Sequence, residues 1–219
     1  MTHSEENYLK VIYHLHGATP KGVNTNAIAL MMETKASSVT DMLKKLAEKE
    51  LVDYQKYQGV TLTEKGLLAA KMIIRKHRLW EVFLVKKLGF AWDEVHEIAE
   101  ELEHIQSEKL TDKLDEFLDF PSFDPHGDPI PNKNGEIKMM HKLVLSEATT
   151  NSSYLFVGVK NSSVEFLQYL DKQNISLGVI LNIVSKEEFD ASLHIEVSGK
   201  PLTISHKIAE NLFVKPVQS

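Results

Sequence analysis

The chain has 219 residues, of which 42% are hydrophobic and 26% charged, and its net charge is −6. This composition suits a globular protein of one large or two to three small domains. There is no apolar run near the roughly 20 residues that span a bilayer, and the N-terminus lacks the pattern of a secretory signal. The absence of cysteine excludes disulfides, thiolate zinc sites and iron–sulfur clusters. We therefore expect a cytoplasmic protein that does not use a membrane.

The charge is distributed unevenly along the chain. Residues 1–76 carry eleven Lys/Arg against eight Asp/Glu, whereas residues 77–219 carry fourteen against twenty-three. A basic head on an acidic body is typical of a head that binds polyanions. A +3 segment of this length is common, so charge alone does not identify the partner.

The head reads as three helices followed by a β-hairpin. Apolar spacing predicts helices over residues 4–16, about 24–32 and 37–50, with Ser4 capping the first and Ser37 or Ser38 the third. In the second, Ile28, Ala29, Met31 and Met32 are expected to pack, and in the third Val39, Met42, Leu43 and Leu46. The alternation in residues 51–66, broken by Gln58-Gly59, predicts a hairpin. This order predicts a winged helix-turn-helix.

The outward face of the third helix is the predicted contact with double-stranded DNA. Short polar side chains near the start of a helix and lysines further along suit the major groove, and a hairpin tip can reach backbone phosphate. The predicted DNA-binding residues are Ser37, Ser38, Thr40, Asp41, Lys44 and Lys45 of the helix, with Lys56 and Tyr57 at the tip. A helix-turn-helix that binds only protein is the alternative.

Three more helices are expected in the middle of the chain. The patterns predict a long helix from Thr63 to about Lys87, a second from about Ala91 to Ile105, and a third within residues 107–120. Helices of this kind could form a homodimer interface, which a DNA-binding head needs in order to bind two half-sites.

Two of these helices carry histidine and glutamate at helical spacing. His96, Glu100, Glu103 and His104 would share one stripe, and His77 and Glu81 are spaced i, i+4. Imidazole and carboxylate suit Mn(II), Fe(II), Co(II), Ni(II) or Zn(II). From spacing alone a solvated acidic face is an equal alternative, because Glu94, Glu97 and Glu101 are acidic as well.

Several motifs in this order resemble the DtxR/MntR family of metal-dependent transcriptional repressors. They are SEENYLKVIYHL, SSVTDMLKKL, RKHRL, VHEIAEELEH and PHGDPIP. The resemblance implies that a metal corepressor ties the first helix to the central helices and orders the dimer for successive major grooves. It implies one metal site at His77, Glu81 and His96. It implies a second at Glu100, Glu103 and His104, with Asn7 at a first-helix position that reaches it.

The chain departs from the family pattern at three of these positions. Where iron sensors carry cysteine it has Glu100, as manganese sensors do, and a hard carboxylate favours Mn(II) over a softer ion. Asn7 replaces Met or Asp and is a neutral, weaker donor. Lys10 stands where the short manganese sensors have a glutamate ligand, so their binuclear geometry is not expected here. We expect Mn(II), with Fe(II) next.

The remaining chain reads as a connection followed by a β-domain. Residues 120–137 are rich in Pro, Gly and Asn, which indicates an irregular linker, and His126 within it is expected to be a polar loop residue. Short alternating segments and one helix, VEFLQYLDKQ, predict a small β-barrel in residues 138–219. The family's long members have an SH3-like domain here, which we expect to modulate the site without supplying a ligand.

The predicted fold class is α+β, with three domains. They are a winged helix-turn-helix (1–72), a helical metal-binding and dimerisation domain with its linker (73–137), and an SH3-like, FeoA-like domain (138–219). We predict that the protein is a homodimeric repressor that binds palindromic operator DNA when a metal is bound. It is not expected to be an enzyme or to take a small-molecule substrate. The alternatives are a small metallohydrolase using the His/Glu cluster and a metal-independent winged-helix regulator.

Overall fold

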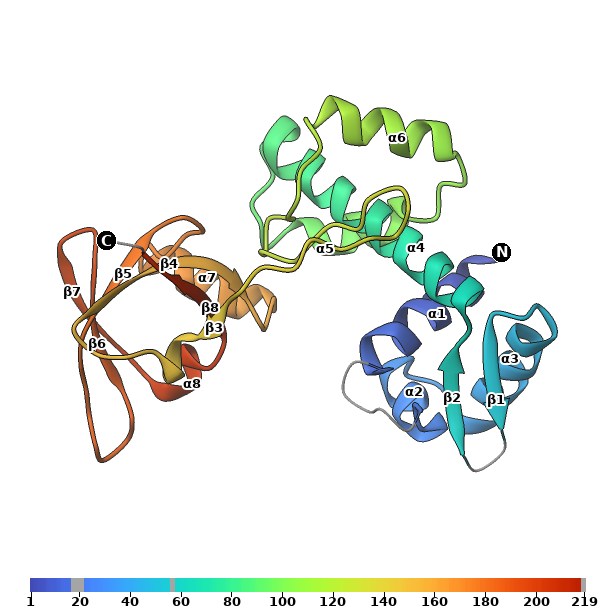
Figure 1. The fold of residues 1–219 in the computed structure, drawn as a ribbon, viewed down its shortest axis with the longest axis horizontal. Helices are drawn as coiled ribbons and strands as arrows, with labels where there is room; N and C mark the ends of the chain where they lie inside the picture. Colours follow the sequence, from blue (N-terminus) through green and yellow to red (C-terminus); the bar gives the residue numbers. More distant parts are fainter. Residues whose placement is uncertain (17–21, 56–57, 218–219) are drawn as a thin grey trace. The chain divides into compact units, whose positions relative to one another are not determined.

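The computed structural model describes residues 1–16, 22–55 and 58–217, which form two compact units (Figure 1). Unit 1 comprises residues 1–80, 100–117 and 131–137, and unit 2 comprises residues 81–99, 118–130 and 138–219. The boundaries of these units at residues 80/81 and 99/100 each fall within a helix. They differ from the three domains expected from the sequence, and the boundaries of those domains stay predictions. In the part of the chain that is described, no helix is both long and apolar enough to cross a membrane.

Unit 1 begins with α1 (His3–His16), which buries Tyr8, Leu9 and Ile12 in the unit's core. Thr2 caps this helix in a reciprocal pair with Glu5. The Glu5 N–H donates to Thr2 Oγ1 at 3.3 Å, and the Thr2 N–H donates to Glu5 Oε2 at 3.0 Å, an arrangement that satisfies two orphan donors. The expected Ser4 cap was wrong, because the helix starts one residue earlier.

Two short helices complete the helical part of the head. In α2 (Thr25–Met31) the Asn24 side chain caps the first turn, and Ile28 and Ala29 are buried. Met31, expected to pack, is instead 54% exposed. In α3 (Ala36–Glu48) the cap is Lys35, without a side-chain hydrogen bond, so the expected serine cap was wrong.

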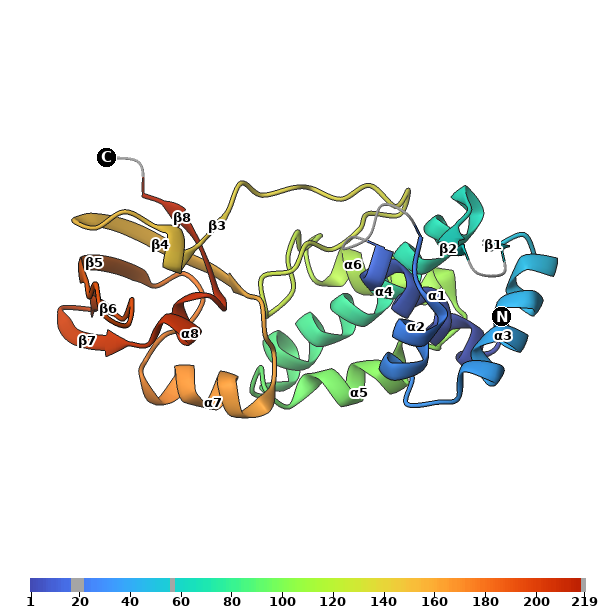
Figure 2. The same ribbon diagram turned by 90° about the horizontal axis from the view of Figure 1, so that it is seen from below.

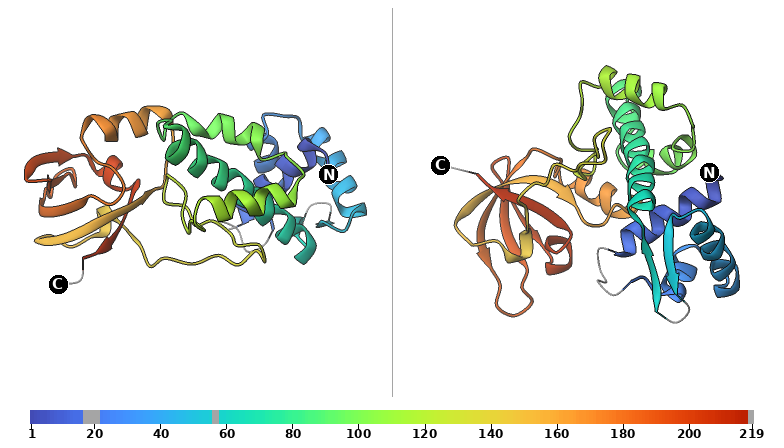
Figure 3. Two further views of the ribbon diagram at one scale, coloured as in Figure 1. Left: turned by 90° about the horizontal axis from the view of Figure 1, so that it is seen from above. Right: turned by 45° about the vertical axis from the view of Figure 1, so that its right-hand side comes forward.

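The inner face of α3 and the hairpin share one core. Val39, Leu43 and Leu46 are fully buried and Met42 packs against them, as expected. Strands β1 (Val52–Gln55) and β2 (Gly59–Leu62) pair antiparallel, and β1 lies beside α3 (Figure 3, right). The winged helix-turn-helix is therefore confirmed in its element order, while the predicted tip residues 56–57 lie outside the described residues.

The central helices are α4 (Glu64–Phe83), α5 (Val95–Leu102) and α6 (Glu108–Phe117). A π-helical segment (Leu84–Leu88) extends α4 and ends at Gly89, whose φ of 76° places it in the left-handed region. The second central helix is shorter than expected at both ends. Residues 103–104 lie in the turn after α5, so the predicted His/Glu stripe runs past the end of its helix.

Unit 2 contains a six-stranded antiparallel sheet in the order β3-β8-β4-β5-β6-β7. The strands are β3 (Leu143–Val144), β4 (Ser152–Val159), β5 (Ile180–Lys186), β6 (Leu193–Val197), β7 (Lys200–Ile204) and β8 (Leu212–Pro216). A 3₁₀ turn (Leu145–Glu147), α7 (Val164–Lys172) and α8 (His206–Ala209) accompany them. The predicted α+β class is confirmed, whereas β8 and α8 were missed.

One core of buried side chains holds these elements together, and Figure 2 shows α7 along one side of the strands of unit 2. Leu167 and Leu170 of α7 pack with Phe156 of β4 and Val214 of β8, and all four side chains are buried. Trp92, from the segment between α4 and α5, packs against the same core. That segment is therefore fixed to the β-domain by apolar contact.

Candidate metal centre and nucleic-acid interface

Helices α4 and α5 each present two of the predicted ligands one turn apart. His77 and Glu81 lie on α4, and His96 and Glu100 lie on α5. Residues four apart share one helix face, so each helix offers a pair of donors. Of the residues predicted for the first site, His77 belongs to unit 1, and Glu81 and His96 belong to unit 2.

In unit 2 the carboxylate of Glu81 is the centre of a buried group. Glu81 Oε1 lies 3.6 Å from Nδ1 of His96 and 3.6 Å from Nδ1 of His126. The Glu81 side chain is 3% exposed and that of His126 is 7% exposed, whereas that of His96 is 58% exposed. Glu81 is therefore a buried acceptor that two imidazoles approach.

Asp124 completes what we call the Glu81 cluster, which consists of Glu81, Asp124 and His126. One ligand atom from each lies within 4.8 Å of the other two, and all three residues are buried. Such a set of two carboxylates and an imidazole could hold a divalent ion. His126 lies in a loop, as predicted, but its side chain is buried beside two carboxylates.

The loop that carries Asp124 and His126 is docked on β4. Asp124 Oδ1 accepts from the N–H groups of His126 (2.8 Å) and Asp128 (2.9 Å). Gly127 has φ of 86°, and a Cβ there would lie 2.1 Å from the Val157 carbonyl oxygen. Only glycine fits this position. The Asp-Pro-His-Gly order of residues 124–127 was the feature of the sequence that could have indicated this tight loop.

A hydrogen bond sets the orientation of the His126 ring. Its Nε2 lies 2.8 Å from the Trp92 carbonyl oxygen, which can only accept, so Nε2 carries the proton and Nδ1 faces Glu81. Burial lowers the pKa of His126, but the Glu81 carboxylate, Asp124 and the Trp92 carbonyl together raise it to about 9. Without an ion the ring is thus held as a cation beside two carboxylates.

Helix α7 of the β-domain holds the segment that carries Trp92. Trp92 Nε1 donates to Asp171 Oδ2 at 3.0 Å, and Gln168 Nε2 donates to Asp93 Oδ2 at 2.9 Å. The Trp92 and His126 rings are stacked with centroids 6.2 Å apart. The β-domain therefore supports the Glu81 cluster through Trp92.

In unit 1 a second acidic group surrounds Lys10 of α1. Lys10 Nζ lies 2.5 Å from Glu100 Oε1, and 2.7 Å and 2.9 Å from the two oxygens of Glu103. His77 Nδ1 lies 2.8 Å from Glu103 Oε2. Burial raises the pKa of Glu103, but hydrogen bonds from His77 and Lys10 outweigh it and lower the pKa overall. Glu103 is therefore a buried, charged carboxylate.

His104 is held by a different acid. Its Nδ1 donates to Glu6 Oε2 at 2.6 Å, its ring stacks on His3, and Gln106 Nε2 donates to Glu6 Oε1 at 2.9 Å. Asn7, the remaining predicted ligand of the second site, has a buried Oδ1 without a hydrogen-bond partner among the described residues. The structure thus brings Glu100 and Glu103 together around Lys10 and pairs His104 with Glu6.

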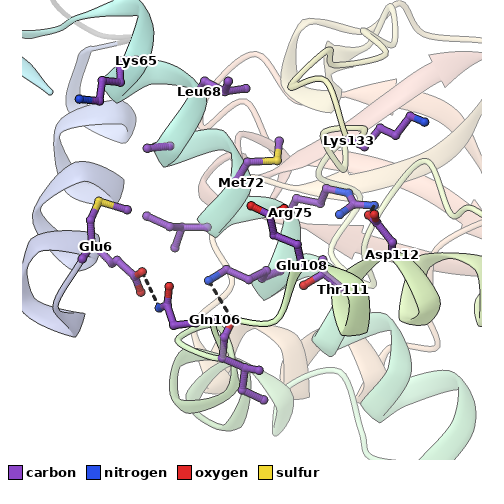
Figure 4. A pocket seen from close by; sticks show the side chains of 15 residues that line it. Glu6, Lys65, Leu68, Met72, Arg75, Gln106, Glu108, Thr111, Asp112 and Lys133 are labelled. Atoms are coloured by element: carbon purple, nitrogen blue, oxygen red, sulfur yellow. Dashed lines mark hydrogen bonds and ion pairs between the residues drawn. The ribbon is translucent and has the colours of Figure 1, made fainter. Parts of the chain in front are cut away.

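A cavity of about 480 Å³ opens beside this part of unit 1. Glu6 and Gln106 lie at one end of it, and Leu68, Met72 and Arg75 of α4 line its wall (Figure 4). Lys76 also lines it, and burial lowers the pKa of its ammonium group. Glu6, the partner of His104, lines this cavity although its side chain is only 1% exposed.

The outward face of α3 is exposed as predicted. Ser37, Ser38, Asp41, Lys44 and Lys45 are exposed, and Thr40 is half-buried. Lys44 Nζ lies 3.4 Å from Asp41 Oδ1 at the surface, and Thr40 Oγ1 donates to the Ala36 carbonyl at 3.0 Å. The face can therefore meet a groove, while the other predicted contacts, Lys56 and Tyr57, lie outside the described residues.

Three family models match successive segments of the chain. Residues 1–60 match the iron-dependent repressor N-terminal DNA-binding domain, and residues 63–132 match the iron-dependent repressor metal-binding and dimerisation domain. Residues 143–216 match the FeoA domain. The iron-dependent repressor IdeR of Mycobacterium tuberculosis is 35% identical over 128 residues, which are 58% of this chain and 54% of IdeR.

Solved structures match nearly the whole chain. A manganese-dependent transcriptional repressor in complex with manganese shares 33% identity, covers 97% of this chain and 100% of its own, and has a TM-score of 0.85. ScaR with bound Cd²⁺ shares 35% identity, covers 97% of this chain and 99% of its own, and has a TM-score of 0.78. The similarity therefore extends through all three matched segments.

Proposed function

Because the chain belongs to the family of metal-dependent transcriptional repressors, we propose that a divalent ion activates it for binding to operator DNA. In this proposal it acts in the cytoplasm as a homodimer on a palindromic operator, with one α3 in each of two successive major grooves. Its targets are genes of manganese or iron homeostasis. The ion has a structural role rather than a catalytic one.

The exposed face of α3 supplies the contacts with DNA. Lys44 and Lys45 are placed for phosphate, whereas Ser37, Ser38, Thr40 and Asp41 lie nearer the start of the helix, the end that meets base edges in this motif. Lys56 and Tyr57 would extend the contact from the hairpin tip. Two half-sites require two chains, for which exposed Leu110 and Phe117 of α6 offer apolar dimer contacts.

The ion would be held around Glu81. His77 and His96 are its partners by the family pattern, and Asp124 and His126 bring two further donors to the same carboxylate. When bound, the ion supplies positive charge that neutralises the carboxylates and fixes their side chains. His126 must lose its proton to ligate, so ion binding replaces the His126–Glu81 pair of the metal-free protein.

The donors favour Mn(II), with Fe(II) next. Apart from the imidazole nitrogens they are carboxylate oxygens, and the chain has no thiolate to select a softer ion. Glu100, Glu103, His104 and Asn7 would hold a second ion. Glu100→Cys tests the preference, because a thiolate at this position should move selectivity from manganese toward iron.

The single observation that carries this function is the buried Glu81 cluster, because three ionisable side chains are rarely buried together unless paired or bound to a metal. In a chain with an exposed α3 face, that chemistry fits a metal-controlled DNA-binding protein. A solvated acidic face would leave Glu81 at the surface, whereas its side chain is 3% exposed.

Gel shifts with an operator fragment test the proposal. Wild type should bind only with Mn(II) or Fe(II), and His77→Ala, Glu81→Ala and Glu103→Ala should each abolish that binding. His194→Ala is the matched control, because this histidine pairs with Glu187 within the β-domain and should leave binding unchanged. Equal binding by the variants without metal would show a metal-independent regulator.

A further inference from the structure

The ammonium group of Lys10 lies between the two carboxylates that the family pattern assigns to the second ion. Its Nζ is within 2.9 Å of both oxygens of Glu103 and 2.5 Å from one oxygen of Glu100. The side chains of Lys10 and Glu103 are 12% and 0% exposed. Lys10, Glu100 and Glu103, which we call the Lys10 cluster, therefore form a largely buried ion-pair group.

His104, another donor of this set, is also paired within the protein, and so is His77 of the first set. His77 donates to Glu103, and His104 donates to Glu6. A buried carboxylate needs a compensating charge, and here Lys10 provides it for Glu103. In the metal-free chain a cation of the protein itself thus already offsets part of the negative charge of the second set.

The Lys10 cluster also joins α1 to the turn after α5. Lys10 is on α1, Glu100 is in the last turn of α5, and Glu103 follows it. In the family this connection is attributed to the metal. Lys10 makes it by direct hydrogen bonds between residues 90 and 93 positions apart in the sequence.

We propose that Lys10 is a built-in competitor of the second ion: it holds α1 to Glu100 and Glu103 without metal, and an ion enters only by displacing its ammonium group. This inference rests on the proposed function of the chain as a metal-activated repressor. An ammonium and a divalent ion repel each other strongly at these distances in a buried site, so both cannot lie between the same carboxylates.

Asn7 supports the displacement. It lies three residues before Lys10, on the same side of α1, and its Oδ1 is buried without a hydrogen-bond partner among the described residues. A neutral oxygen without a donor suits a cation. Once Lys10 has left, Asn7 can add an oxygen to those of Glu100 and Glu103.

Equilibrium dialysis with Mn(II) on the full chain tests the proposal through the Lys10→Gln variant. Wild type should have one tight class of Mn(II) site and a second, weaker class. Lys10→Gln should raise the Mn(II) affinity of the second class by about tenfold or more, the scale on which groups beside ligands alter metal affinity. Lys49→Gln is the matched control, because Lys49 at the end of α3 also forms an ion pair with α1: its Nζ lies 2.6 Å from Glu5 Oε1. It should leave both classes unchanged.

Lysine labelling of wild type gives a second measurement that needs no variant. With an amine-acylating reagent and mass spectrometry, Lys10 should be several-fold more reactive when Mn(II) fills the second class than in chelator. Lys49 should not change.

The outcomes separate the two claims. An unchanged second class in Lys10→Gln, two equally tight classes in wild type, or no second class in either protein would each overturn the role of Lys10. Unchanged labelling of Lys10 on saturation would overturn it as well. Absence of any Mn(II) binding to wild type would instead contradict the proposed function. In that case thermal unfolding in chelator would still test whether Lys10 holds α1 to Glu100 and Glu103. Lys10→Gln should have a lower melting temperature than Lys49→Gln, and equal melting temperatures would refute this connection.

Discussion

The carbonyl oxygen of Trp92 accepts a hydrogen bond from Nε2 of His126 at 2.8 Å, while the indole N–H of the same tryptophan donates to Asp171 of α7. One residue thus links the β-domain to a candidate ligand. Mutating a group that orients a ligating histidine typically lowers metal affinity by about 10- to 100-fold. We therefore expect the FeoA-like segment to act on the site by fixing Trp92.

Removing the acceptor for Trp92 should weaken metal binding. Asp171→Ala deletes one hydrogen bond, worth about 0.5–1.5 kcal/mol, so we expect Mn(II) affinity at the Glu81 cluster to fall by up to about tenfold. Calorimetric titration measures this. The control is Glu187→Ala, which removes an acid that pairs with His194 in the same unit. If Asp171→Ala binds Mn(II) as tightly as that control, the link through Trp92 has no role.

His126 should behave as a ligand rather than as a loop residue. Its loss removes a direct donor, so His126→Ala should weaken Mn(II) binding by at least about 100-fold, the upper end of the effects seen for groups that only support ligands. Equilibrium dialysis against buffered Mn(II) measures the change, with His194→Ala as the control. Equal affinity of the two variants would exclude His126 from the site.

Gly127 should be sensitive because its loop lies against β4. Gly127→Ala combines left-handed strain with a contact of 2.1 Å to the Val157 carbonyl, and we expect unfolding free energy to fall by about 3 kcal/mol or more. Gly199→Ala isolates the strain: its φ is 78° with nothing within 4 Å, and about 1 kcal/mol is expected. Denaturant unfolding compares them, and equal losses would show that the loop does not press on β4.

The lysines of α3 should contribute through phosphate. If each contacts one phosphate, Lys44→Ala and Lys45→Ala should each lower the slope of log affinity against log salt by about 0.9. They should also weaken binding to operator and random DNA alike. Fluorescence anisotropy at several salt concentrations measures both effects. Lys200→Ala, an exposed lysine of β7, is the control, and slopes matching it would remove α3 from the interface.

Local patterns predicted the head well because each of its helices buries residues at helical spacing. Val39, Leu43 and Leu46 of α3 are buried as their spacing indicated. The caps were less predictable: Ser4 and Ser37 are good capping residues, but Thr2 caps α1 through Glu5, and Lys35 precedes α3 without a side-chain cap. Capping preferences allow neighbouring residues to compete.

The site could be predicted only in part, because several of its contacts join distant residues. The ligand pairs of α4 and α5 follow from their i, i+4 spacing. The burial of His126 depends on its loop docking on β4, where the Val159 N–H donates to the His126 carbonyl at 2.9 Å. No local pattern indicates that contact, nor that the Lys10 ammonium reaches Glu103.

Operator affinity of the full chain, measured by anisotropy across buffered free Mn(II), Fe(II) and Zn(II) at one stated salt concentration, tests the central claim most directly. The account predicts negligible specific DNA binding in chelator and saturable DNA binding as the free concentration of Mn(II) or Fe(II) rises. Mn(II) should act at a lower free concentration than Fe(II). Specific binding of equal strength in chelator and in saturating metal would contradict it.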